Sequence, residues 1–234
     1  MAARTPEPST RPARAQPPGL FVPGWAATAG LYRRALPDGW EALEPPRFGA
    51  AGGALEPYRA RLEREVARRG GRVRLAGHSM GAALALLVAA ERPEAVERLV
   101  LVAPAGLPLR KPFARILLTS LGQACRGLYP PGELVRIVLG VAVSPRCALR
   151  LARTVHGLDL TAELLRVRDA GVRSTVVACT SDELTPASHC RRLAELLGAA
   201  YRELDAPGGH VWMLARPALL RAELALELRE RDLP

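Results

Sequence analysis

The sequence predicts an α/β fold built on a doubly wound, mostly parallel sheet. From residue 20 onward, short apolar runs alternate with segments whose apolar residues recur at helical spacing, and this alternation is typical of consecutive βαβ units. The run at 99–102 is apolar at every position, which indicates a parallel strand covered on both faces. A chain of 234 residues, 49% of them hydrophobic, is long enough for one such domain with one large core.

Each expected element has a local reason. The expected strands lie at 20–22, 40–43, 72–76, 96–102, 174–179 and 200–204, and the expected helices at 57–69, 80–91, 186–197 and 211–229. The helix at 57–69 has Tyr58, Leu62 and Val66 on one stripe and ends before a pair of glycines. The helix at 80–91 is apolar on nearly every side, so we expect it to be buried.

Two segments fall outside this alternation. Residues 1–18 combine many prolines with arginines, and we expect them to form a disordered tail. Residues 105–158 show helical patterns broken by Pro and Gly, without a strand. We therefore expect residues 19–234 to form one domain, with a small helical cap over the site inserted at about 105–158. Packing of this insertion against the flank of the sheet is the alternative.

The charge does not indicate a nucleic-acid site. The formal net charge of +10 comes almost entirely from arginine, and acidic residues are interleaved with many of these arginines. Such a pattern indicates solvated helix faces, and no aromatic residues alternate with the basic ones as a site for single strands would need. We expect a small-molecule substrate and no nucleic-acid partner. No oligomeric state is indicated.

The cysteines and the N-terminus indicate a cytoplasmic protein. Cys125, Cys147, Cys179 and Cys190 lack the close spacing of a zinc or redox motif. The N-terminus has no apolar segment of the kind that a secretory signal needs, so free thiols in a reducing compartment are expected. The longest strongly apolar run, 82–90, is too short to span a bilayer.

The candidate nucleophile is Ser79, within the G-x-S-x-G sequence Gly77-His78-Ser79-Met80-Gly81. The motif alone is weak, but here it follows an expected strand and opens an expected helix, which is the setting of a nucleophile elbow. Strand and helix approach closely at such a turn, so a Cβ at position 77 or 81 would collide. His78 points elsewhere in such a turn, and we interpret it as a packing residue.

His210 is the candidate base. It follows a Pro-Gly-Gly sequence after the last expected strand, so it should reach the same sheet edge as Ser79 and accept the proton of its hydroxyl. Of the other histidines, His189 is expected on the exposed side of a helix. His156, at the end of the insertion, is expected to be solvated or packed, with a place along the substrate path as the alternative.

Asp182 is the candidate acid that orients His210. It follows the expected strand at 174–179, in a loop ahead of a helix, and a turn-forming or helix-capping role is the alternative. Glu183 is the nearest rival, whereas Asp205 ends the strand that leads to His210 and would have to turn back. The three candidates occur in the chain order Ser79, Asp182, His210.

Two backbone amides are expected to hold the developing oxyanion. The Met80 amide directly follows the nucleophile, and the second donor should come from the loop Val22-Pro23-Gly24-Trp25 after the first strand. We expect the Trp25 amide there, because Gly24 lets the backbone approach the substrate. The Trp25 side chain is expected in the acyl pocket, with a core aromatic as the alternative.

Together these residues resemble the α/β-hydrolase superfamily, in particular small serine carboxylesterases such as the pimeloyl-carrier-protein methyl esterases. The most specific matches are the motif at 77–81, the segment at 182–186, and Gly209-His210. The resemblance implies about six strands, because the usual first hairpin is missing, and a catalytic triad without metal or organic cofactor. The chain departs from the family at Pro23-Gly24, where members commonly have His-Gly.

The function implied is hydrolysis of a carboxylic ester with a short to medium acyl chain, through an acyl-enzyme. The expected substrate-binding residues are Trp25, Leu107, Phe113, Leu117 and Trp212. A thioesterase or acyltransferase with the same triad is the first alternative. A ligand-binding protein with little turnover on the same fold is the second.

Overall fold

Six strands form one parallel sheet in the computed structural model, which describes residues 18–229. The strands are β1 (Gly19–Val22), β2 (Trp40–Ala42), β3 (Val73–His78), β4 (Val96–Val102), β5 (Ser174–Cys179) and β6 (Ala200–Leu204). They lie in the order β2-β1-β3-β4-β5-β6, and every neighbouring pair is parallel. The predicted fold class and strand number are confirmed.

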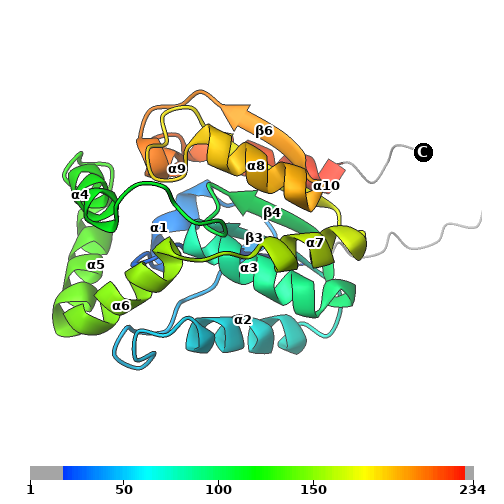
Figure 1. Cartoon of the computed structure of the whole chain (residues 1–234), viewed down its shortest axis with the longest axis horizontal. Coiled ribbons are helices and arrows are strands. Elements are labelled where there is room, and N and C mark those ends of the chain that lie inside the picture. Colours follow the sequence, from blue (N-terminus) through cyan, green and yellow to red (C-terminus); the bar gives the residue numbers. More distant parts are fainter. Residues whose placement is uncertain (1–17, 230–234) are drawn as a thin grey trace, which may run out of the picture.

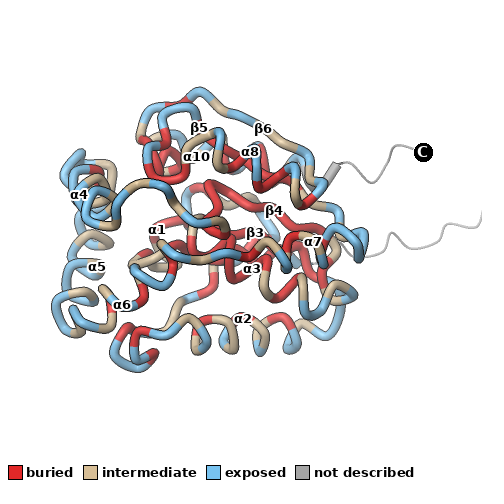
Figure 2. Tube along the Cα trace, in the orientation of Figure 1, coloured by how far each residue is buried: buried red, intermediate tan, exposed pale blue. Residues whose placement is uncertain are grey.

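Helices cover both faces of this sheet (Figure 1). One apolar cluster joins the sheet to α2 (Glu56–Arg68), α3 (Met80–Glu91), α7 (Thr161–Asp169) and α8 (Ala187–Leu197). The other joins it to α1 (Ala29–Tyr32), α9 (Trp212–Ala215) and α10 (Pro217–Arg229). Alternate strand residues enter opposite clusters, as Leu20 and Phe21 do on β1. This explains why the inner strands are buried in Figure 2.

The topology places one point of the sheet where a ligand can bind. From β1 the chain runs outward to β2, then returns to place β3 on the other side of β1 and continues to β6. The winding direction therefore reverses between β1 and β3. In sheets of this kind, ligands bind at the carboxyl ends of the strands beside that reversal. The loops after β1 and β3 are those that contain Trp25 and Ser79.

Between β4 and β5 the chain forms α4 (Phe113–Ala124), α5 (Pro131–Val143) and α6 (Pro145–His156) before it returns to the sheet through α7. We call residues 113–156 the helical insertion. Its helices lie to one side of the sheet, at the left of Figure 1. Helix α6 buries Ala148, Leu151 and Val155 in the main core, whereas α5 has no buried residue.

Some elements differ from the expected ones. The helix expected at 211–229 is divided, because Pro217 interrupts it and starts α10; a short 3-10 turn, Gly209–Val211, precedes α9. Two further 3-10 turns lie at Arg33–Ala35 and Pro93–Ala95. Helices α1 and α7 were not expected. The tail predicted at 1–18 lies almost wholly outside the described residues. Within 18–229, no helix has both the length and the apolar character needed to cross a bilayer.

Candidate active site

Ser79 occupies a strained turn between β3 and α3. Its backbone angles, φ 55° and ψ −117°, lie in a region that non-glycine residues rarely adopt. The flanking glycines make this turn possible: a Cβ on Gly77 would collide with the backbone of Gly81, and one on Gly81 would collide with the carbonyl oxygen of Val22. The turn therefore has the geometry of a nucleophile elbow.

Backbone strain gathers at the same edge of the sheet. Among residues 18–229, positive φ outside glycine occurs at Ala26, Ser79 and Ala103. Ala26 lies in the loop after β1, and Ala103 directly follows β4. Strain of this kind persists where surrounding structure holds the backbone, and it is concentrated at functional sites.

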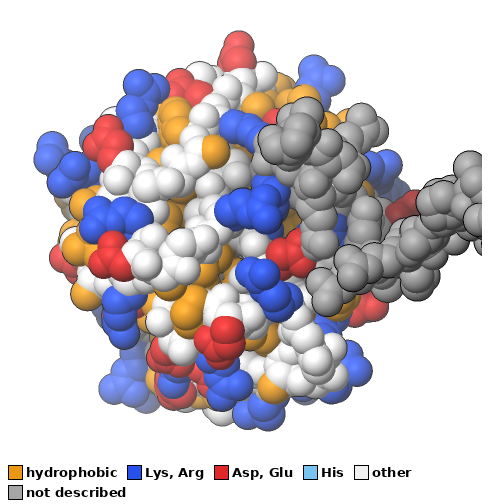
Figure 3. Space-filling view, turned by 90° about the vertical axis from the view of Figure 1, so that its right-hand side faces the viewer, with side chains coloured by type: hydrophobic (Ala, Val, Ile, Leu, Met, Phe, Trp, Pro, Cys, Tyr) orange, Lys and Arg blue, Asp and Glu red, His pale blue; other side chains and the backbone are white. Residues whose placement is uncertain are grey.

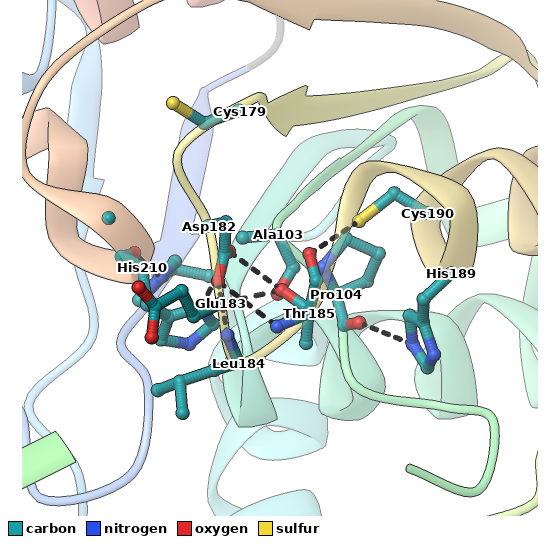
Figure 4. Close-up of polar contacts among 12 residues, drawn as sticks. Ala103, Pro104, Cys179, Asp182, Glu183, Leu184, Thr185, His189, Cys190 and His210 are labelled. Atoms are coloured by element: carbon teal, nitrogen blue, oxygen red, sulfur yellow. Dashed lines mark hydrogen bonds and ion pairs between the residues drawn. The ribbon is translucent and has the colours of Figure 1, made fainter. Parts of the chain in front are cut away.

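A buried carboxylate–imidazole pair lies beside this edge (Figure 4). The Nδ1 atom of His210 is 2.8 Å from Oδ2 of Asp182, and both residues are buried. Burial by itself would raise the pKa of the Asp182 carboxyl, but the charge and hydrogen bond of His210, together with donors from Thr185, lower it below its usual value. Asp182 thus stays ionised and holds Nδ1 protonated, which leaves Nε2 of His210 as the basic nitrogen.

Asp182 is fixed by its own loop. Its Oδ1 atom accepts hydrogen bonds from the backbone amides of Leu184 (2.8 Å) and Thr185 (3.0 Å), and the Thr185 hydroxyl donates to Oδ2 at 2.8 Å. The turn-forming role and the orienting role therefore belong to the same side chain. The rival acids lie elsewhere: Glu183 is exposed, and Asp205 accepts a hydrogen bond from Thr180.

Ser79 and His210 line one cavity of about 600 Å³. Within the described part of the chain, no hydrogen bond joins the Ser79 hydroxyl to the imidazole of His210. Such bonds are often long without a substrate and tighten when one binds. The cavity walls are mainly aliphatic side chains of α4, α5 and α6, as in pockets that hold an apolar ligand.

His78 is buried and connects three loops of the site. Its Nε2 atom donates to the carbonyl oxygen of His210 at 3.0 Å, so its Nδ1 atom accepts from the hydroxyl of Tyr32 at 2.8 Å. The Tyr32 oxygen in turn accepts the amide of Gly24 at 3.4 Å. Burial, with His210 nearby, lowers the pKa of His78 to about 3. The packing role predicted for His78 is confirmed, and the residue is neutral at physiological pH.

The loop after β1 lies against the nucleophile. A Cβ on Gly24 would stand 3.4 Å from the Cβ of Ser79, so the next residue, Trp25, is adjacent to the site. Met80 is the first residue of α3, where backbone amides have no partner within the helix. The Trp25 indole donates to the carbonyl oxygen of Ala148 on α6 at 3.0 Å, so its side chain joins this loop to the helical insertion.

The expected substrate-binding residues divide into two groups. Trp25, Phe113 and Leu117 line the cavity. Leu107 and Trp212 are not among the described residues that line the cavity, so for them the prediction is wrong. Leu107 packs against the main core, and Trp212 is fully buried in the second apolar cluster. Trp212 follows His210 closely in sequence, but the short helix α9 turns its indole toward the core.

The other histidines also have defined places. His156 lines the cavity, and its Nε2 atom donates to the carbonyl oxygen of Lys111 at 2.8 Å. His189 is half-buried rather than exposed as expected, because its Nε2 atom donates to the carbonyl oxygen of Pro104 at 3.1 Å (Figure 4).

Sequence reasoning missed three contributors to the site. Thr185 had a local signal, since a hydroxyl residue three positions after Asp182 can close a turn on the carboxylate. Tyr32 had none, because its partner His78 is 46 positions away. Gln123 of α4 is buried, and a Cβ on Gly209 would stand 2.6 Å from its Nε2 atom; the insertion thus also touches the loop of His210.

Solved structures of other proteins share this fold. The chain is similar to a bacterial membrane phospholipase A (22% identity, TM-score 0.72, 94% of this chain and 81% of that chain). It is also similar to a lipase-esterase related protein from Clostridium acetobutylicum ATCC 824 (13%, 0.70, 89% and 93%) and to the thioesterase domain from the curacin biosynthetic pathway (18%, 0.58, 90% and 91%). At such identities the likeness shows the fold alone.

Comparison of the sequence with curated proteins finds no match. None of the three structures named above is a pimeloyl-carrier-protein methyl esterase, so that finer resemblance stays a prediction. The model of the alpha/beta hydrolase family matches residues 20–223, which include every strand and all three candidate triad residues. The chain belongs to the alpha/beta hydrolase family.

Proposed function

We propose that the protein is a serine esterase that cleaves carboxylic esters through an acyl-enzyme, with Ser79, Asp182 and His210 as its triad. The observation that carries this proposal is the buried 2.8 Å contact between Asp182 and His210, beside a cavity that His210 shares with Ser79. An ionised carboxylate and a single available imidazole nitrogen are what an ordinary hydroxyl needs to become a nucleophile.

The reaction proceeds in two stages. His210 Nε2 takes the proton of Ser79 as its oxygen attacks the acyl carbonyl, and the amides of Met80 and Trp25 hold the oxyanion. The carbonyl re-forms, the bond to the leaving alcohol breaks, and His210 donates the proton to that alcohol. Water, deprotonated by His210, then attacks the acyl carbonyl. The bond between the acyl group and Ser79 breaks, the acid leaves, and His210 returns the proton to Ser79.

The acyl group would lie among the aliphatic walls that the helical insertion provides. Phe113 and Leu117 of α4 and Ile137 of α5 line the cavity together with Trp25. We therefore propose a short to medium acyl chain, and we propose that the insertion acts as a cap. Since all four cysteines are unpaired, a cytoplasmic location is part of the proposal.

The test is hydrolysis of p-nitrophenyl esters of graded chain length. Ser79→Ala should lower kcat/KM by at least about a thousandfold, and a fluorophosphonate should label wild type but not this variant. Ser188→Ala, which alters an exposed serine of α8 outside the cavity, is the matched control and should keep full activity. Turnover that survives in Ser79→Ala would contradict the proposal. A folded protein without turnover or labelling would favour a ligand-binding role.

A thioesterase or acyltransferase is the second candidate, and one observation favours it. Arg146, Arg150 and Arg153 of α6 line a surface hollow of about 590 Å³ with Thr154, and no ion pair to a described residue occupies these arginines. Three such guanidinium groups suit the phosphates of an acyl-CoA. Comparison of kcat/KM for acyl-CoA and for a simple ester of the same acyl group, in wild type and in Arg150→Gln, would separate the two functions.

A further inference from the structure

The outer surface of the helical insertion is unusually apolar. Among the described residues, seven of the eight exposed large hydrophobic side chains belong to α4 and α5, and Val143 is 81% exposed. We call these seven residues the apolar face: Leu117, Leu118, Leu121, Val135, Val138, Leu139 and Val143. Three of them, Leu117, Leu121 and Val138, line one cavity, and an exposed apolar set of this size marks an interaction surface. Figure 2 shows the same two helices as mainly exposed.

The apolar face continues into the cavity that holds Ser79. Leu117, Leu121 and Val138 are exposed to solvent and also line that cavity. An apolar molecule could therefore pass from the surface to the nucleophile along side chains of one kind. A surface that served only to bind another folded protein would not need this continuity.

The helical insertion has a strong excess of positive charge. Residues 113–156 contain six Arg and one Glu, which gives a net charge of +5, half of the net charge of +10 of the whole chain. The single carboxylate, Glu133, accepts a hydrogen bond from Thr28. Arg115 lies in the first turn of α4 and Arg126 lies just after its end. Both are exposed, and neither forms an ion pair with a described residue. On the side of the molecule opposite the insertion, by contrast, basic and acidic side chains are interspersed (Figure 3).

We propose that the apolar face and its bordering arginines dock this protein on an anionic lipid surface. Aliphatic side chains that enter the interface, surrounded by cations that meet lipid phosphates, are the combination that holds a helix in the plane of a membrane. A second copy of the chain is a poorer partner, because two insertions that each have a net charge of +5 repel each other. An acidic protein matches the arginines but leaves the continuity with the cavity unexplained. This inference goes beyond ester hydrolysis.

The experiment is co-sedimentation of the Ser79→Ala protein with vesicles of phosphatidylcholine, with and without phosphatidylglycerol. Ser79→Ala keeps the lipids intact and makes binding independent of the proposed chemistry. We expect binding to the anionic vesicles only, weakened by salt. Leu118→Gln with Leu139→Gln should weaken it about tenfold by removing apolar surface at constant charge. Arg115→Glu with Arg126→Glu should weaken it about a hundredfold at low salt.

Each pair of substitutions has a matched control elsewhere on the surface. Leu226→Gln replaces an exposed leucine of α10, and Arg61→Glu with Arg64→Glu makes the same change of net charge on exposed residues of α2. The controls should bind as the parent protein does. The same surface substitutions are also made in the protein that retains Ser79, and these variants are assayed with p-nitrophenyl acetate. Loss of vesicle binding and loss of ester hydrolysis then remain distinct results.

Three outcomes would overturn the proposal. The first is the absence of binding to anionic vesicles at low salt. The second is vesicle binding that the Arg61→Glu, Arg64→Glu variant weakens as much as the Arg115→Glu, Arg126→Glu variant, which would assign the binding to net charge. Binding that polyglutamate abolishes, while the Leu118→Gln, Leu139→Gln variant binds normally, would instead assign the surface to an acidic polypeptide. The third is a dimer, detected by sedimentation velocity, that the leucine pair dissociates.

Discussion

Helices α3 and α5 are both mainly apolar in sequence, but α3 is buried and α5 is exposed. Helix α3 reads MGAALALLVAAE and buries nine of its residues, whereas α5 reads PGELVRIVLGVAV and buries none. The difference comes from position in the fold, because α3 leaves the strand β3 directly and packs on the sheet, while α5 lies between two connections far from it. Apolar character therefore identifies the core only where the topology provides a partner surface.

The two helices also differ in what their residues can contribute. In α3 each apolar side chain removes surface from water on folding and so stabilises the chain. In α5 the outer side chains stay in water and contribute little to stability. Such residues are costly for solubility, which is consistent with their use in a contact that the isolated chain does not show.

The largest effect should come from glycine substitutions in the two helices. Gly81→Ala in α3 places a Cβ against the carbonyl oxygens of Val22 and Pro23, and should destabilise the protein by about 4 kcal/mol and abolish activity. Gly140→Ala in α5 meets nothing within 4 Å, and should stabilise it by about 1 kcal/mol through helix propensity. Urea unfolding measures both; similar values would remove the distinction between the helices.

The second-largest effect on stability is expected from replacing one leucine in each helix by alanine. Leu86→Ala in α3 deletes a side chain that is 1% exposed and should cost about 3 kcal/mol. Leu139→Ala in α5 deletes an exposed side chain and should change stability by less than about 0.5 kcal/mol. The midpoint and slope of urea unfolding report both variants. A large loss in Leu139→Ala would mean that the apolar face is a structural contact.

Acid should destabilise the site beside α3 through His78. Its folded-state pKa of about 3 lies below the usual value of 6.5, so protonation favours the unfolded chain. The stability that neutral His78 provides is complete above pH 6.5 and is lost as the pH falls toward 3, about 2 kcal/mol of it by pH 5. The lowered pKa of Asp182 acts in the same direction at lower pH, below the usual value of 3.8. His78→Gln should reduce the fall in the free energy of unfolding measured from pH 7 to pH 5. An unchanged slope would mean that other groups cause this fall.

The smallest effect concerns a single hydroxyl. Tyr32→Phe removes the group that joins Gly24 to His78 and should cost about 1 kcal/mol of stability, with a fall in kcat at unchanged KM as the loops of the site loosen. Tyr201→Phe is the control, because it removes the same group from a tyrosine outside the cavity, whose hydroxyl contacts Ala187 and Glu203. Equal effects in the two variants would contradict the positioning role of Tyr32.

The turn at Ser79 and the elements on either side of it could be predicted from neighbouring residues in the sequence. The glycines at 77 and 81, the strand before them and the helix after them predict the elbow because each acts on its immediate neighbours. The place of His210 followed from the rule that parallel strands end at one edge. The link from Tyr32 to His78 and on to His210 could not be predicted, since it joins three distant segments. The apolar residues of α5 also gave no sign of their exposure, because periodicity cannot tell a core helix from one that lacks a partner.

The hydrogen bond from the Trp25 indole to Ala148 has a mechanical consequence. The helical insertion contacts the loop after β1, whose Trp25 amide is the proposed oxyanion donor. Through Gln123 it also lies against Gly209, next to the proposed base His210. A rigid shift of these three helices would thus realign donor and base at once. Substrate entry and the alignment of the proposed catalytic groups would therefore depend on the same three helices.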